Sequence, residues 1–141
     1  MMSDASNRAE QLALEFLRRV WGPQHDLDAI DELMTEDYVI TSGGKVIRGR
    51  EAFKAWVGQF QEHLLDARTA NVDVFSDAAG DSVVSRWICT GKNHGLLGLP
   101  PDGRRVSFTG IALWRVRDGK LAECWVERSA WELYQELSGL P

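Results

Sequence analysis

Acidic, aromatic and hydroxyl side chains alternate near the end of the sequence, in the order Glu123, Trp125, Glu127 and Ser129. Side chains of a β-strand point alternately to its two faces, so these four would share one face. A plain core disfavours this composition because an unpaired buried charge is costly. The pattern predicts a pocket wall, with Glu127 as the candidate for proton transfer and Trp125 as a substrate contact. The alternative is that Glu123 pairs with a nearby arginine and does no chemistry.

Arg86 is a second charged residue in an apolar setting, since Val84 and Ile88 would lie on the same strand face. A guanidinium there could bind a substrate carboxylate, or it could neutralise Glu123 or Glu127. The sequence leaves both alternatives open.

Six tryptophans are a high number for a chain of 141 residues. Each indole supplies a large, rigid apolar surface and one hydrogen-bond donor. They fit either an aromatic core or a pocket walled for a bulky, flat, apolar ligand. On the second interpretation, Trp56, Trp114 and Trp125 contact the ligand together with Tyr38.

Helices are predicted first along the chain and strands afterwards, which is typical of an α+β fold. The expected elements are helices over residues 9–20, 27–34, 53–64 and about 130–137, a short strand over 36–40, strands near 69–75 and 82–90, and two strands joined at Asp118-Gly119. The tight turns between the strands predict an antiparallel sheet.

The stretch from Gly95 to Glu127 carries the most specific motifs. A glycine-rich loop precedes the Pro100-Pro101-Asp102-Gly103 turn, and the run RVRDGKLAECW follows, with Asp118-Gly119 as a two-residue hairpin signal. These motifs resemble those of the SnoaL-like polyketide cyclases, a branch of the nuclear transport factor 2-like superfamily.

The resemblance implies a cone-shaped barrel, in which a curved antiparallel sheet wraps around three N-terminal helices and leaves one deep pocket. A short C-terminal helix completes this fold. The resemblance extends over nearly the whole chain, so we expect a single domain over residues 1–141. Residues 1–7 are polar and are expected to be frayed.

The resemblance also bears on the chemistry. In that family an aspartate four places after the tryptophan typically acts as acid and base in an aldol-type ring closure, without metal or cofactor. Ser129 occupies this place here, and a serine hydroxyl is no general base near neutral pH unless another group activates it. Either Glu127 has taken over proton transfer, or the pocket promotes a reaction that needs no strong base.

Two further site candidates follow from the same resemblance. The loop before the prolines often carries a histidine in the family, and either Asn93 or His94 fills that polar position here. A histidine there could polarise a carbonyl or shuttle a proton, whereas the alternative is a surface-loop residue. In related folds the position of Asp37 approaches the mouth of the pocket.

Composition excludes several other classes. The net charge of −5 and the lack of a basic cluster give nucleic-acid binding little support. No cleavable leader or long apolar run stands out, so we expect a cytoplasmic protein without a membrane partner. Cys89 and Cys124 form no C-x-x-C pair and are expected to be buried free thiols. The histidines lack metal-ligand spacing, and no nucleotide-binding or nucleophile-elbow motif is present, so neither metal nor cofactor is expected.

The sequence therefore predicts a cofactor-independent cyclase that closes a ring in a bulky polyketide-like intermediate, by an aldol-type step or a cycloaddition. The alternatives are an epoxide hydrolase or isomerase of the same fold, with Arg86, Glu127 and Asp37 as its charged set, and a non-catalytic ligand-binding dimer. A homodimer is expected, with Ile111, Leu113 and Cys89 as contacts on the outer face of the sheet. The candidate catalytic residues are Glu127, His94 and Asp37, and the candidate substrate contacts are Trp125, Ser129, Arg86, Asn93, Trp56, Tyr38 and Trp114.

Overall fold

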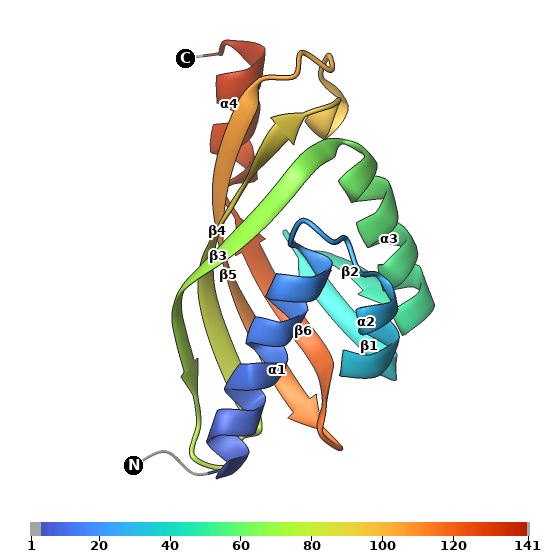
Figure 1. The fold of residues 1–141 in the computed structure, drawn as a ribbon, viewed down its shortest axis with the longest axis vertical. Coiled ribbons are helices and arrows are strands. Elements are labelled where there is room, and N and C mark those ends of the chain that lie inside the picture. Colours follow the sequence, from blue (N-terminus) through green and yellow to red (C-terminus); the bar gives the residue numbers. More distant parts are fainter. Residues whose placement is uncertain (1–3, 141) are drawn as a thin grey trace.

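A computed structural model of the protein describes residues 4–140 and has an α+β architecture (Figure 1). The elements are α1 (Asp4–Val20), α2 (Asp28–Leu33), β1 (Met34–Ser42), β2 (Lys45–Arg48), α3 (Arg50–Glu62), β3 (Leu64–Ser76), β4 (Ser82–Asn93), the 3₁₀ turn η1 (Leu96–Gly98), β5 (Arg105–Arg117), β6 (Lys120–Arg128) and α4 (Ala130–Ser138). One curved sheet holds all six strands in the order β2-β1-β6-β5-β4-β3, and it does not close into a barrel.

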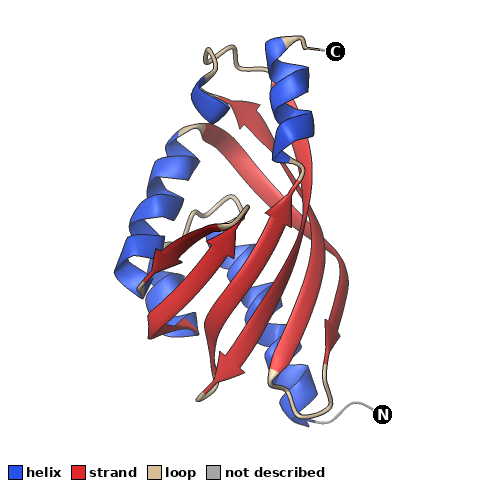
Figure 2. Cartoon of the chain, turned by 180° about the vertical axis from the view of Figure 1, so that it is seen from behind, coloured by secondary structure: helices blue, strands red, loops and turns tan. Residues whose placement is uncertain are grey.

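The three N-terminal helices lie on one face of the sheet, and the view from behind shows the strands of the opposite face in front of them (Figure 2). We call the helix-covered face concave and the other face convex. The short helix α4 lies at one end of the molecule, beside the loop that follows β4 (Figure 2). Each layer buries the apolar side of the other, as expected of an α+β domain.

Helix α1 follows the predicted apolar stripe, and Ala9, Ala13 and Phe16 are among its buried residues. It begins at Asp4, inside the stretch 1–7 that we expect to be frayed, and residues 1–3 lie outside the described part. The first turn is held by tertiary packing, because Ser6 is buried against Ser76 of β3. Tertiary contacts of this kind stabilise a polar helix end that propensity alone would leave open.

The hairpin predicted at Asp118-Gly119 is confirmed. Both residues have positive φ angles, 53° and 73°, as a two-residue turn between right-twisted strands requires. The other predicted strands are longer in the structure, and β3 begins at Leu64, where the sequence pattern suggested the end of a helix. Strand β2 was not predicted, because its four residues are mostly exposed and show no alternation.

One strand pair departs from the predicted antiparallel sheet. Strand β1 runs parallel to β6, with Ile40 opposite Cys124, whereas every other pair recorded in the described sheet is antiparallel. Hairpin turns determine only the pairs that are adjacent in sequence, and β1 reaches β6 from the helical layer instead. This parallel pair brings the first strand beside the last and completes the concave face.

The core lies on the concave face of the sheet. In β5 the buried side is made of Val106, Phe108, Gly110, Ala112 and Trp114, which alternate with exposed or half-buried residues. A Cβ atom at Gly110 would lie 2.2 Å from the indole of Trp87. Glycine at this position therefore allows the Trp87 ring to lie flat across β5, where it packs edge-on against Phe108.

Candidate functional site

A cavity of about 30 Å³ lies between α1, α3 and the concave face of the sheet. Its wall is aromatic, aliphatic and thiol-bearing, with few polar groups. The lining residues are Phe16, Leu17, Trp21, Tyr38, Ile40, Phe53, Thr69, Trp87, Cys89, Phe108, Ala112, Trp114, Cys124, Val126 and Arg128. Pockets for drug-sized ligands usually span about 300–1,000 Å³, so such a ligand would require wall side chains to move apart.

Two polar atoms in this wall have no hydrogen-bond partner among the described residues: the Tyr38 hydroxyl and the Trp114 indole nitrogen. Both side chains are buried, and the hydroxyl lies beside the Trp114 indole and the Cys124 thiol without a hydrogen bond of normal geometry. Burial raises the pKa of Tyr38 well above its usual value, so the hydroxyl keeps its proton at neutral pH. Buried tyrosines and tryptophans usually find partners, which makes two unpartnered donors in one cavity unusual.

Arg128, at the end of β6, is the charged residue of the described cavity wall. Its Nη1 donates a hydrogen bond to Ser42 Oγ at 2.7 Å, and its guanidinium lies 5.3 Å from the ring centre of Trp56. Burial lowers its pKa from the usual value. Arginine nevertheless stays charged in proteins, so the cavity wall contains a permanent positive charge at Arg128.

The two cysteines are free and buried, which confirms their prediction as unpaired thiols, and both line the cavity. Burial raises the pKa of Cys89, and it raises the pKa of Cys124 to about 12. Thiolate is the reactive form of cysteine, so at neutral pH these two residues act as small apolar wall groups.

The predicted orientation of β6 is wrong. Trp125 and Glu127 are exposed on the convex face, whereas Cys124, Val126 and Arg128 line the cavity. The side chains alternate between the two faces as expected, but the more apolar face of the strand points inward. Burying two carboxylates without partners would be too costly. Glu127 and Trp125 therefore lie across the sheet from the cavity.

The three polar candidates around the loop and the end of β6 also lie outside the cavity wall. Ser129 Oγ accepts a hydrogen bond from Thr109 N at 2.9 Å and so joins the end of β6 to β5. Asn93 is buried, but its amide holds the loop by donating to Asp102 Oδ1 at 2.9 Å and accepting from Leu96 N at 2.8 Å. His94 is exposed on that loop.

The charged candidates Asp37 and Arg86 are exposed and form ion pairs with other residues. Asp37 pairs with Arg117, and Arg86 Nε donates to Asp73 Oδ2 at 2.8 Å. The structure does not bring Asp37, Arg86 and Glu127 together at the cavity, so the charged set suggested for epoxide opening is not assembled there.

Three aromatic candidates are at or beside the cavity. Tyr38 and Trp114 line it directly. Trp56 packs edge-on against Trp21 of the wall, with ring centres 6.4 Å apart, and contacts the Arg128 guanidinium. The interpretation of these rings as pocket walls is thus compatible with their positions, and their contact with a ligand remains a prediction.

Sequence reasoning missed Arg128 together with Cys124 and Val126 on the inner face of β6. The available signal was the composition of the two faces of the strand. One face contains two acids, and the other contains Cys124, Val126 and a single arginine. Burying the second face places fewer charges in the interior, so the cost of buried charge favours the second face as the inward one. The position of Trp87 in the wall had a signal as well. A glycine within a strand, here Gly110, often marks a place where a large side chain of a neighbouring strand packs against the backbone.

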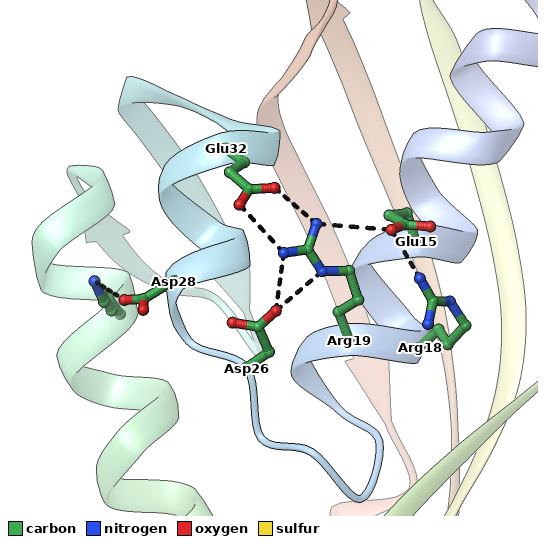
Figure 3. Close-up of polar contacts among 7 residues, drawn as sticks. Glu15, Arg18, Arg19, Asp26, Asp28 and Glu32 are labelled. Atoms are coloured by element: carbon green, nitrogen blue, oxygen red, sulfur yellow. Dashed lines mark hydrogen bonds and ion pairs between the residues drawn. The ribbon is translucent and has the colours of Figure 1, made fainter.

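Charged residues are concentrated instead between the helices, away from the cavity. Figure 3 shows Arg19 of α1 between Glu15, Asp26 and Glu32. Its hydrogen bonds to Glu32 and Asp26 raise its pKa, and the cluster fastens α1 to α2 and to the loop between them. These contacts position the helical layer that covers the cavity.

Within residues 4–140, no group of three or more His, Cys, Asp or Glu side chains is arranged to hold a metal ion. Among the described helices, none is long and apolar enough to cross a lipid bilayer.

Comparison with known proteins identifies the family. The family model of the SnoaL-like domain matches residues 13–124, and the chain therefore belongs to the SnoaL-like family. No curated protein sequence matches it.

Solved structures share the fold. A candidate SnoaL-like polyketide cyclase from Jannaschia sp. CCS1 is 23% identical with a TM-score of 0.90, covering 100% of this chain and 99% of that one. TsrD from Streptomyces laurentii is 25% identical with a TM-score of 0.81, covering 100% of both chains. An epoxide hydrolase of the LEH-like type from M. tuberculosis is 18% identical with a TM-score of 0.73, covering 95% of this chain and 92% of that one.

Proposed function

We propose that this protein is a cofactor-independent cyclase that binds a conjugated, largely apolar molecule in the aromatic cavity and promotes closure of a ring. The observation that carries the proposal is the pair of unpartnered donors, the Tyr38 hydroxyl and the Trp114 N–H, in the wall of an otherwise apolar cavity. The names of several structural neighbours as candidate polyketide cyclases agree with it.

The chemistry follows from where these donors lie. A neutral hydroxyl and an indole N–H can donate hydrogen bonds to a carbonyl oxygen and polarise it, and they act strongly where water is excluded. The positive charge of Arg128 at the same cavity favours any negative charge that develops on that oxygen. The surrounding rings restrict the conformers of a flexible chain. Holding the reacting atoms close together in this way can lower the activation barrier by on the order of several kcal/mol.

The wall composition favours a ring closure that needs no base. The described lining residues include no Asp, Glu or His, so the cavity offers no ordinary proton acceptor for an aldol-type step. A cycloaddition converts two π bonds of the substrate into two σ bonds, moves no proton and is promoted by polarising a conjugated carbonyl. The proposal is therefore specific to carbonyl-bearing dienes or polyenes.

The test is turnover of a panel of linear conjugated carbonyl compounds, followed by loss of diene absorbance and by product mass. Ring closure leaves the mass unchanged, whereas epoxide opening adds one water that labelled water would trace. We expect turnover that a chelator does not affect, a Tyr38→Phe variant slowed about tenfold or more, and a Glu127→Gln control at wild-type rate. A Glu127→Gln variant that loses activity while Tyr38→Phe retains it would contradict the proposal.

A second candidate function is ligand binding without chemistry, and the same lack of an acidic or imidazole group in the described wall favours it. The two functions differ in one measurement. A binding protein would quench its tryptophan fluorescence with conjugated ligands yet return every one of them unchanged.

We also propose that the protein forms a homodimer through its convex face. Ile88, Ile111 and Trp125 are exposed there, and Leu113 is half-buried between them. Arg115 and Glu127 on the same face provide opposite charges that a two-fold contact could pair. Cys89, expected earlier as a contact, faces the cavity instead.

A further inference from the structure

Arg128 differs from arginines such as Arg19, because no carboxylate in the described chain forms an ion pair with it. No carboxylate of the described residues lies within ion-pair distance of it, and its protein contacts are the Ser42 hydroxyl and the Trp56 ring. Arg19, by comparison, is surrounded by three carboxylates (Figure 3).

The titratable neighbours of Arg128 inside the cavity cannot neutralise it. Tyr38, Cys89 and Cys124 all have pKa values raised by burial, so each stays neutral at physiological pH. Glu127 is adjacent in sequence, but it points to the convex face and is exposed, so its attraction for the guanidinium is the smallest of the contributions to the pKa of Arg128. Partial burial of this charge without a carboxylate partner is unfavourable, and a bound anion would offset that cost.

The guanidinium is also accessible to a ligand. Arg128 and its contacts Ser42 and Trp56 are half-buried, whereas Tyr38 and Trp114 are almost fully buried, so Arg128 lies at the end of the cavity nearer solvent. Nη1 donates to Ser42, and its other nitrogens are not sealed from solvent. The Trp56 ring centre lies 5.3 Å from the guanidinium carbon, and a guanidinium can bind a planar carboxylate through two N–H groups at once.

We propose that the ligand of this cavity is a conjugated carboxylic acid, whose carboxylate pairs with Arg128 at the mouth while its unsaturated chain lies among the aromatic walls. This inference rests on the proposed function, in that the cavity binds a small molecule. It adds the charge of the ligand and its orientation, with the carboxylate outward at Arg128 and the conjugated, carbonyl-bearing part toward Tyr38 and Trp114.

The test compares two probes of equal shape, trans-cinnamate and cinnamamide, by calorimetry and tryptophan quenching at pH 7.5. We expect the wild type to bind the carboxylate about 10-fold to 100-fold more tightly than the amide. Arg128→Gln should bind both probes equally, with amide affinity preserved. Arg128→Lys should keep part of the preference, because it retains the charge and loses the bidentate geometry.

Arg115 provides a matched control. Its guanidinium lies 5.7 Å from the Trp125 ring centre and it donates to the Ser82 hydroxyl, so it repeats the surroundings of Arg128 on the convex face. Arg115→Gln should leave the carboxylate preference unchanged.

Thermal unfolding separates recognition from a structural role. Without ligand, Arg128→Gln should have an unchanged or higher Tm, because an unpaired charge is removed. A marked fall in Tm, equal binding of both probes by the wild type, or a preference that survives in Arg128→Gln would each overturn the inference. Equal binding of both probes would leave the proposed function standing, whereas failure of both probes to enter the cavity would count against the two together.

Discussion

The Tyr38 hydroxyl is a buried polar group in a largely apolar part of the cavity wall. It is buried, protonated and without a hydrogen bond of normal geometry, and its ring centre lies 5.0 Å from that of Phe53. An unsatisfied buried polar group costs about 1–3 kcal/mol, so its presence indicates a role other than stability.

Replacing Tyr38 with phenylalanine should therefore stabilise the protein while it slows turnover. We expect the free energy of unfolding to rise by up to about 1 kcal/mol, measured by urea denaturation, because the unpaired hydroxyl is removed. Tyr134→Phe, on α4, serves as the control and should change neither quantity. A Tyr38→Phe variant that is clearly destabilised would mean that the hydroxyl has a structural partner.

Cys124 should make the stability of the protein depend on alkaline pH. Its thiol ionises near 9 in the unfolded chain and at about 12 in the fold, so the folded state keeps a proton that the unfolded state releases. The associated stability is fully present below pH 9 and is lost as the pH rises toward 12. The free energy of unfolding of Cys124→Ala should fall less steeply with pH over this window, and identical slopes in the two proteins would disprove the assignment.

At the scale of elements, the sequence predicted types better than orientations. The stripes of α1 and α3 and the Asp118-Gly119 turn are local features, since a helix face and a hairpin depend on neighbours in sequence. Which face of β6 points inward is not a local property. Side chains alternate between both faces, and only packing against the rest of the protein decides which face is buried. The inward face of β6, and with it Arg128, was therefore missed, as was the parallel pairing of β1.

Gly110 links the strand geometry of β5 to the cavity. In Gly110→Ala the new methyl group would lie 2.2 Å from the Trp87 ring and displace it into the cavity. We expect a loss of about 1–3 kcal/mol of stability, as for overpacked cores, and at least tenfold weaker binding of cinnamamide. Ser107→Ala, exposed on the convex face of the same strand, is the control and should retain both properties. Unchanged binding by Gly110→Ala would place the ligand elsewhere.

At the scale of the whole molecule, the two faces of the sheet differ in what they present. The concave face and its helices form the cavity, and the convex face exposes Ile111 and Trp125. A change on the convex face should therefore alter association and leave the cavity intact.

Ile111→Glu tests this separation. Two copies of an added carboxylate would face each other across a two-fold contact, so the variant should be monomeric by light scattering under conditions where the wild type is a dimer. Val46→Glu, an equally exposed site on β2, should not change the mass in solution. Cinnamamide affinity should stay at the wild-type value in both variants, and a wild type that is already monomeric would refute the dimer.

The parallel pairing of β1 with β6 has a consequence for folding. Val39 of the first strand lies opposite Glu123 of the last, so the loop that this contact closes contains most of the chain. Contacts between such distant segments form late and slow the search for the native state, typically to milliseconds or seconds. The Cys124 and Arg128 side of the wall thus assembles only after the strands between have formed, and an incomplete chain that lacks β6 would leave its aromatic interior open to aggregation.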